Sequence, residues 1–239
     1  MREMDFPRRF GRSNKTQLRL ENAPQHGIGK RGSGSALSGV AKYLLDTTLA
    51  VAGLVVLLPM IVMLIVIVLV LQGRPVFIAH RRIGKNGVMF ACLKFRTMVI
   101  DADQVLTRHL ADNPRCREEW IATRKLRNDP RVTPFGAIMR KSSVDEIPQL
   151  LNIILGNMSL VGPRPIAAGE AELYGVHYAD YIKVRPGLTG LWQVSGRNET
   201  TYGERVQLDV RYVRERTILG DIAILIRTIP AVLHSRGSY

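Results

Sequence analysis

The sequence predicts an α+β, mainly helical fold with a proline-broken re-entrant membrane helix, a compact cytosolic domain and interfacial helices. A basic polar stretch precedes one long apolar run, a proline interrupts that run, and the remainder mixes helical periodicity with short β-like stretches. We divide the 239 residues into a basic arm (1–38), a membrane helix (39–73) and a cytosolic domain (74–239) that ends in an interfacial helix. A chain of this length can bury a full-sized core.

The charge balance predicts an anionic partner. The chain has 34 Lys and Arg against 20 Asp and Glu, which gives a formal net charge of +14. Anionic lipid, nucleic acid or a phosphorylated substrate would each satisfy this charge. Aromatic residues make up only 6% of the chain, which is few for the stacking platforms of single-strand binders. We keep a basic nucleic-acid binder as a rival hypothesis, and we expect no nucleic-acid partner.

The basic arm, residues 1–38, is rich in Gly, Ser, Asn and Gln. It cannot bury much apolar surface, so we expect a disordered or loosely tethered segment. Its charge could hold it against anionic lipid, and a solvated tail is the alternative.

Residues 54–71 are apolar throughout, and about 20 such residues can cross a bilayer. Pro59 lies inside the run, where it removes a helical hydrogen bond and favours a bend. Basic residues flank both ends, so the positive-inside rule gives no direction. A broken helix that enters and leaves by the cytosolic face satisfies both flanks. A kinked spanning helix is the alternative.

A β-like stretch follows the apolar run. GKNG at 84–87 indicates a turn between two strands. In the second strand Lys94 and Arg96 would share one face and present two cations together, although a solvated strand face has the same pattern. Residues 101–127 predict a surface helical segment with little chemistry of its own.

The stretch RKSSVDEIPQ (140–149) places two carboxylates side by side in a chain that is poor in acids. Ser143 and Glu146 fit a capping box, in which the serine caps a helix and the glutamate reaches back to it. Pro148 complicates that interpretation, because a helix capped by Ser143 would place the proline past its first turn. Capping and catalysis are compatible. We also expect nearby cations to keep Asp145 and Glu146 ionised at neutral pH.

Two turn-rich segments, GPRP (162–165) and VRPGLTGLWQVSGRN (184–198), set arginines among prolines and glycines. Arginine offers phosphate a bidentate fork, so Arg164, Arg185 and Arg197 are candidate phosphate ligands as a set. Trp192 could stack on a base or sugar, and a core position is the alternative. Residues 217–233 suit a helix at the membrane surface or a core helix.

These parts together favour phosphoryl transfer at a membrane surface. Cations would neutralise a pyrophosphate, and a carboxylate would serve as nucleophile or metal ligand. Oxygen ligands with few histidines predict Mg²⁺ rather than Zn²⁺. The sequence contains no P-loop, no GxSxG and no HExxH.

The motifs KFRTM (94–98), RKSSVDEIPQLLNIILGNMSLVGPRP (140–165) and VRPGLTGLWQVSGRN resemble the bacterial sugar transferase family, the monotopic phosphoglycosyl transferases. HRRIGKNG and the terminal SRGSY are most similar to its exopolysaccharide-priming undecaprenyl-phosphate galactosyl-1-phosphate transferases of the succinoglycan type. Members often have a serine before the helix-breaking proline, whereas Leu58 stands there in this chain.

The resemblance implies transfer of hexose-1-phosphate from a UDP-hexose, galactose or glucose, to undecaprenyl phosphate with release of UMP. It implies membrane lipid as a partner and a catalytic domain on the cytosolic face of the bacterial inner membrane. Asp145 would be the nucleophile, and Asp145 and Glu146 would hold Mg²⁺. The candidates for substrate contacts are Lys94, Arg96, Arg140, Arg164, Arg185 and Arg197. A homodimer is left open, and a non-catalytic membrane scaffold is a further rival.

Overall fold

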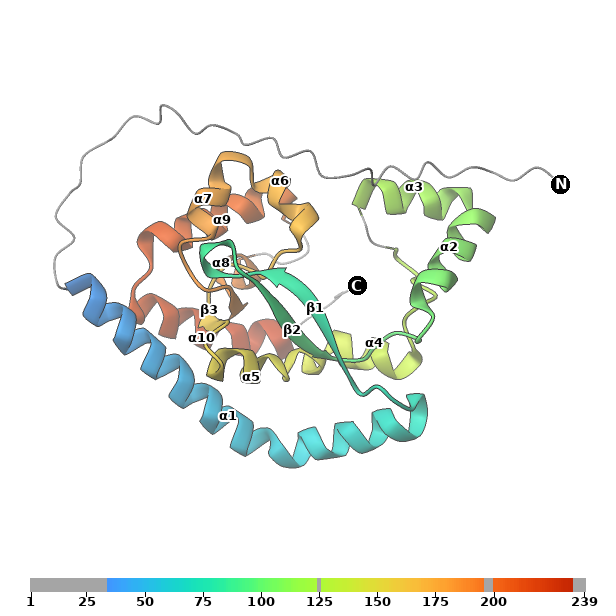
Figure 1. The fold of residues 1–239 in the computed structure, drawn as a ribbon, viewed down its shortest axis with the longest axis horizontal. Helices are drawn as coiled ribbons and strands as arrows, with labels where there is room; N and C mark the ends of the chain where they lie inside the picture. Colours follow the sequence, from blue (N-terminus) through green and yellow to red (C-terminus); the bar gives the residue numbers. More distant parts are fainter. Residues whose placement is uncertain (1–33, 124–125, 196–199, 234–239) are drawn as a thin grey trace.

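Figure 1 shows one long bent helix lying along a domain of short helices and two small sheets. This computed structural model describes residues 34–123, 126–195 and 200–233, so most of the predicted basic arm lies outside the described residues. The chain forms α1 (Gly34–Gln72), β1 (Phe77–Ile83), β2 (Met89–Phe95), α2 (Ala102–Asp112), α3 (Pro114–Thr123), α4 (Pro134–Lys141), α5 (Gln149–Ile154), β3 (Ser159–Val161), α6 (Ala171–Tyr174), α7 (Tyr178–Tyr181), β4 (Gly187–Thr189), α8 (Leu191–Val194), α9 (Tyr202–Glu215) and α10 (Ile218–Leu233). The described residues also form four 3₁₀ turns: η1 (Lys85–Gly87), η2 (Val144–Glu146), η3 (Ala168–Glu170) and η4 (Gly175–His177). The mainly helical fold is confirmed.

Helix α1 continues through Pro59 and curves along the underside of the domain (Figure 1). It is long and apolar enough to cross a membrane, judged by length and composition over Gly39–Gln72. The domain buries its inner side both before the proline, at Ala50, and after it, at Leu64 and Val68. The other side exposes a row of apolar residues, including Val55, Val56, Leu58, Val62, Met63, Val66 and Val70. One helix therefore serves the core and offers an apolar surface.

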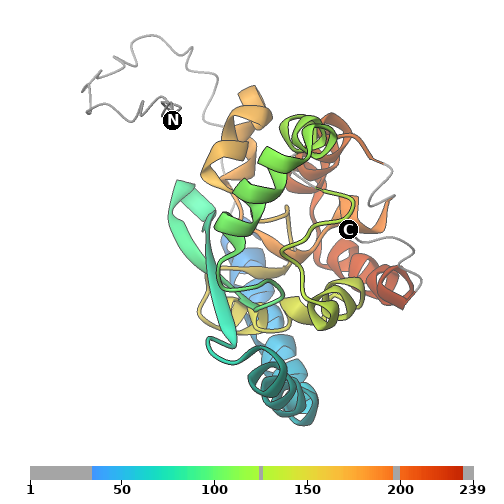
Figure 2. The same ribbon diagram turned by 90° about the vertical axis from the view of Figure 1, so that its right-hand side faces the viewer.

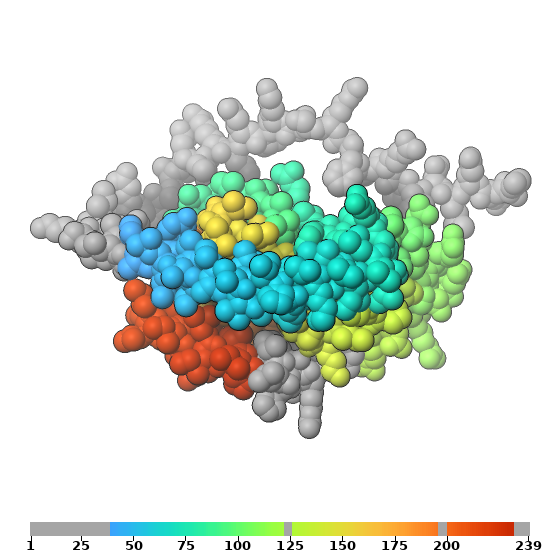
Figure 3. Space-filling view, turned by 90° about the horizontal axis from the view of Figure 1, so that it is seen from below, coloured from blue at the N-terminus to red at the C-terminus, as the bar shows by residue number. Residues whose placement is uncertain are grey.

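Three further helices share the face that α1 crosses. In Figure 3, α10 and α4 lie along one side of α1, and α5 lies along the other. All of them expose large apolar side chains: Ile138 of α4, Leu151 of α5 and Leu155 at its C-cap, and Leu219, Ile222, Ile226 and Ile229 of α10. We call these residues and the exposed side of α1 the apolar platform. The predicted helix near the C-terminus is confirmed as α10.

Strands β1 and β2 form the predicted antiparallel hairpin around residues 84–87. Its register pairs Ile78 with Lys94, His80 with Cys92 and Arg82 with Phe90. Directly opposed residues lie on the same face of a hairpin. Arg82, Cys92 and Lys94 therefore share one face. Helices α2 and α3 lie at one end of the molecule, away from α7 and α9 (Figure 1), and they face the viewer in Figure 2.

The two segments rich in Arg, Pro and Gly lie side by side because one directly follows β3 and the other contains β4, its parallel partner. The Gly162 N–H donates to the Thr189 carbonyl at 2.9 Å, and the Gly187 N–H donates to the Pro163 carbonyl at 2.8 Å. A Cβ at Gly187 would overlap the backbone of Gly162. Glycine is needed here for the close approach of the two backbones.

Asn152 of α5 joins this helix to the hairpin. Its Oδ1 accepts from the Leu93 N–H at 2.9 Å, and its Nδ2 donates to the Ala91 carbonyl at 2.8 Å. The buried side chain thus completes the hydrogen bonding of β2 as a neighbouring strand would. Beside it, Leu150 and Ile153 pack in the same core cluster as Ala50, so α1, α5 and β2 are fixed together.

We predict that Asn152→Leu destabilises the fold by about 2–5 kcal/mol, because it leaves the Leu93 N–H and the Ala91 carbonyl buried without partners. Chemical denaturation measures the loss. Asn113→Ala is the control. Asn113 donates to one carbonyl, that of His109, at the end of α2, and its loss should cost less than about 1 kcal/mol. Equal losses in the two variants would contradict the role given to Asn152.

Candidate functional site

The acid pair lies in a break between α4 and α5. Ser143 adopts a left-handed conformation with φ 58°, and the 3₁₀ turn η2 carries Asp145 and Glu146 directly after it. Helix α5 begins only at Gln149, with Pro148 at its N-cap position, where a missing N–H costs nothing. The capping-box interpretation is wrong, since the Ser143 side chain makes no capping hydrogen bond. A left-handed serine costs backbone energy, as is common at functional sites.

Lys94 faces both carboxylates from the end of β2. Its Nζ lies 2.6 Å from Glu146 Oε1 and 3.6 Å from Asp145 Oδ2. Glu146 is the more open of the two acids, with 23% of its side chain exposed against 8% for Asp145. Lys94 is therefore shared between a buried carboxylate, Asp145, and a more accessible one, Glu146.

Burial governs the electrostatics of Asp145. Removal from water raises the pKa of its carboxyl, and the neighbouring charge of Glu146 raises it further. Lys94 and Arg140 lower it without reversing the net upward direction. The cations lower the pKa of Asp145 as expected, but desolvation is the larger effect, so the net direction is upward. Ionisation of the pair at neutral pH stays a prediction. A buried carboxylate with few water contacts is a stronger nucleophile than a solvated one.

A small cavity extends from Glu146 towards the β3–β4 segments, and Asp145 is not among its lining residues. Its lining includes Lys94, Glu146 and Arg164, together with Arg82, Gln149 and Gln193. The cavity holds about 20 Å³, enough for about one water molecule, so a larger ligand requires side chains to move apart. Two of the predicted phosphate ligands, Lys94 and Arg164, thus line the same cavity as Glu146.

The other predicted cations lie elsewhere or beside the pair. Arg140 donates through Nε to Thr97 Oγ1 at 2.9 Å and acts electrostatically on Asp145. Arg96 is buried and donates through Nη2 to the carbonyls of Gln72 and Gly73 at the end of α1, so the structure does not bring it to the acid pair.

Arg185 and Arg197 complete the predicted set. The Arg185 Nη2 lies 3.5 Å from Asp46 Oδ2 of α1, in a different cavity from that of Arg164. Arg197 lies outside the described residues. The described arginines of the two Arg-Pro-Gly segments therefore do not act as one cluster, although their backbones are adjacent.

Comparison with known proteins decides the family. The family model for bacterial sugar transferases matches residues 37–235. The chain belongs to the bacterial sugar transferase family. It is a transferase. The three motifs quoted above, at 94–98, 140–165 and 184–198, fall within the matched range.

Three relatives illustrate the similarity. The exopolysaccharide production protein ExoY of Rhizobium meliloti (strain 1021) is 48% identical over 225 residues, which are 94% of this chain and 100% of that protein. The ExoY protein of Sinorhizobium fredii is 49% identical over 203 residues, 85% of this chain and 90% of that protein. The undecaprenyl-phosphate galactose phosphotransferase of Salmonella typhimurium is 48% identical over 168 residues, 70% of this chain and 35% of that protein.

The candidate residues chosen from the sequence did not include Arg82. Arg82 lines the cavity, and its Nη1 lies 3.2 Å from Glu170 Oε2. The signal was available, because the turn at 84–87 sets the hairpin register and so places Arg82 on the face of Lys94. Trp192 is buried with the guanidinium of Arg205 over its ring at 4.2 Å, which agrees with the core alternative.

The donor set fits Mg²⁺. The described part of the chain has no group of three or more His, Cys, Asp or Glu that could hold a metal. Two adjacent carboxylates remain, and Mg²⁺ is commonly held by one or two carboxylates while substrate phosphates and water supply the other ligands. Glu146, the more exposed carboxylate, is the better placed ligand.

We predict that Lys94→Met moves the acid limb of the kcat/KM–pH profile to higher pH. As the expected nucleophile, Asp145 would have to be ionised to react, so activity would be lost as pH falls through its pKa. Lys94 lowers that pKa, so removing the lysine raises it further. We also expect kcat to fall by about 10²–10³-fold. Lys94→Arg keeps the charge and should leave the limb near its wild-type position. If Lys94→Met leaves the acid limb unchanged, the limb does not report the ionisation of Asp145 and the prediction is contradicted.

Proposed function

We propose that the protein transfers hexose-1-phosphate from a UDP-hexose to undecaprenyl phosphate and releases UMP, through a phospho-sugar intermediate on Asp145. The observation that carries this proposal is the acid pair beside Lys94, where Lys94 and Glu146 line a cavity together with Arg82 and Arg164. Clustered cations can stabilise a pyrophosphate and the charge that develops on it. The buried carboxylate supplies a nucleophile that conserves the bond energy as an acyl phosphate.

The reaction has two half-reactions at one site. In the first, an Asp145 carboxylate oxygen attacks the β-phosphorus of the UDP-hexose, and the bond from that phosphorus to the bridging oxygen breaks, so UMP leaves. In the second, an oxygen of the lipid phosphate attacks the same phosphorus. The bond to Asp145 then breaks, which restores the carboxylate and forms the lipid-linked diphosphate sugar.

Each residue near the acid pair has a role in this scheme. Lys94 orients the two carboxylates and neutralises the approaching phosphates. Arg164 and Arg82 contact the pyrophosphate from the other side of the cavity, and Arg140 limits the rise in the pKa of Asp145. Glu146, with Asp145, would hold Mg²⁺, which when bound neutralises phosphate charge.

The hexose is proposed from the relatives. The Salmonella typhimurium relative is named a galactose phosphotransferase, and the Erwinia amylovora relative, 46% identical over 198 residues, is named a UDP-galactose-lipid carrier transferase. The Xanthomonas campestris relative, 38% identical, is named a glucose-1-phosphate transferase. We infer galactose first and glucose second, in the priming step of exopolysaccharide synthesis at the bacterial inner membrane.

We also propose that α1 is re-entrant, with the catalytic domain on the cytosolic face. A spanning helix would carry one of its halves away from the domain, whereas this domain buries residues on both sides of Pro59, at Ala50 and at Val68. The apolar platform then lies against the bilayer, as interfacial helices do. Such placement would bring the cavity near a lipid substrate.

The central test of function uses Asp145→Asn. We predict that wild-type membranes release UMP from a UDP-hexose in the presence of Mg²⁺ and undecaprenyl phosphate, and that the variant releases none, because an amide is too poor a nucleophile to form the intermediate. Asp103→Asn, an exposed substitution on α2, should retain activity. UMP release by Asp145→Asn at the wild-type rate would exclude the proposed mechanism.

A second test concerns topology. We predict that impermeant labels reach single cysteines at position 40 and at position 74 from the same side of inverted vesicles, in a chain whose Cys92 and Cys116 are replaced by serine. The two positions flank the apolar stretch of α1. Labelling from opposite sides would show a spanning helix and contradict the re-entrant arrangement.

A further inference from the structure

A second cavity, which we call the basic cavity, lies where the start of α1, the hairpin turn η1 and the start of α10 meet. It holds about 160 Å³ and shares no lining residue with the cavity at the acid pair. Five cations from these separate segments line it: Lys42, Lys85, Lys183, Arg185 and Arg216. The mechanism proposed above uses none of this cavity.

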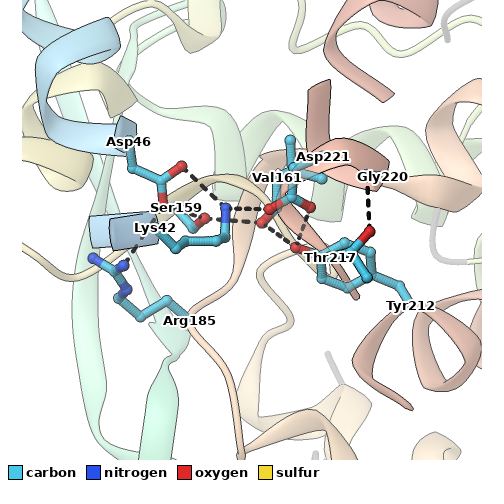
Figure 4. Close-up of polar contacts among 9 residues, drawn as sticks. All are labelled: Lys42, Asp46, Ser159, Val161, Arg185, Tyr212, Thr217, Gly220 and Asp221. Atoms are coloured by element: carbon cyan, nitrogen blue, oxygen red, sulfur yellow. Dashed lines mark hydrogen bonds and ion pairs between the residues drawn. The ribbon is translucent and has the colours of Figure 1, made fainter. Parts of the chain in front are cut away.

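The inner wall of the basic cavity is a buried ionic network (Figure 4). The Lys42 Nζ lies 3.0 Å from Asp46 Oδ1 and 2.8 Å from Asp221 Oδ2. Ser159 Oγ donates to Asp46 Oδ2 at 2.7 Å, and Arg185 Nη2 lies 3.5 Å from the same oxygen. Lys42 and Arg185 therefore balance the two buried carboxylates, and the network fixes α1 to β3 and α10.

The outer wall carries the surplus of positive charge. Lys183 pairs with Asp180 at 2.5 Å, and that carboxylate is shared with Arg214 at 2.9 Å. Lys85 and Arg216 are exposed, and the ion pairs of the described residues include neither. An anion in the cavity would be stabilised by both side chains.

The start of α10 adds to this field. Thr217 and Ile218 line the cavity, and Thr217 Oγ1 accepts from the Gly220 N–H at 3.0 Å as an N-cap. The N-terminus of this 16-residue helix presents the positive end of its macrodipole to the cavity. Together with the surplus cations, it favours a phosphate, which is the anion that helix termini and arginine forks bind best.

Apolar side chains flank the basic cavity. Val40 and Leu44 of α1 and Leu219 of α10 are exposed beside its lining residues. The Arg185 guanidinium lies over the Tyr43 ring, 4.9 Å from its centre, and tyrosine is typical of the membrane–water boundary. A ligand with a phosphate and an apolar tail matches both surfaces.

We propose that the basic cavity binds a phosphate group at the membrane boundary, at a site separate from the acid pair. Two sources share this chemistry, the headgroup of an anionic phospholipid and a soluble phosphate ester, and the flanking apolar residues favour the lipid. A bound headgroup would fix the depth of α1 and α10 in the bilayer.

The test measures thermal stabilisation of the purified protein in neutral detergent during titration with a short-chain phosphatidylglycerol, the matching phosphatidylcholine and glycerol phosphate. We expect wild type to bind phosphatidylglycerol more tightly than phosphatidylcholine. The pair Lys85→Glu and Arg216→Glu should weaken phosphatidylglycerol binding by about tenfold or more. The pair Arg108→Glu and Arg115→Glu, on α2 and α3, changes the net charge equally and should leave binding unchanged.

Equal loss of phosphatidylglycerol binding in the two paired variants, or no loss of binding in either, would overturn the proposal. Glycerol phosphate binding as tight as that of phosphatidylglycerol would support the phosphate site with a soluble source, whereas phosphatidylglycerol binding alone would support a lipid source. Because Lys85 and Arg216 do not line the cavity at Glu146, the variant with Lys85→Glu and Arg216→Glu should still release UMP. That activity confirms folding and keeps this test independent of the proposed function.

Discussion

The hydrogen bonds between the Asn152 amide and the backbone of β2 are the constraint on which the candidate site depends. They hold α5, and therefore the turn η2 just before it, at a fixed height along the hairpin. This position places the turn beside Lys94, whose Nζ pairs with both Asp145 and Glu146. The left-handed Ser143 and the proline at the start of α5 keep the turn from joining either helix, so the acids stay in the gap between α4 and α5.

The same fold makes the membrane helix inseparable from the domain. Asp46 and Lys42 place charges on a helix whose other side is apolar, and both charges are satisfied by groups of the domain. Burying this pair within lipid would be costly, whereas burying it against Ser159 and Asp221 is compensated. The packing of the domain therefore sets which side of α1 is left exposed and apolar.

The sequence was enough to predict the hairpin, the long apolar helix and the helix near the C-terminus, because hydrophobic period and turn residues act locally. The partners of individual side chains were harder to predict. Arg185 pairs with Asp46, 139 positions earlier in the chain, and Arg96 binds the end of α1, so neither position could be inferred from its own segment. The direction of the pKa shift of Asp145 also depends on burial, which only the packed structure shows.

The central claim is that Asp145 becomes covalently bonded to the phosphorus of the sugar phosphate. The most direct measurement is mass spectrometry of the protein after mixing with a UDP-hexose in the absence of lipid acceptor. The account predicts an added hexose phosphate on the peptide that contains Asp145, and its removal when undecaprenyl phosphate is supplied. UMP formed only when the lipid is present, with the protein unmodified throughout, would contradict it.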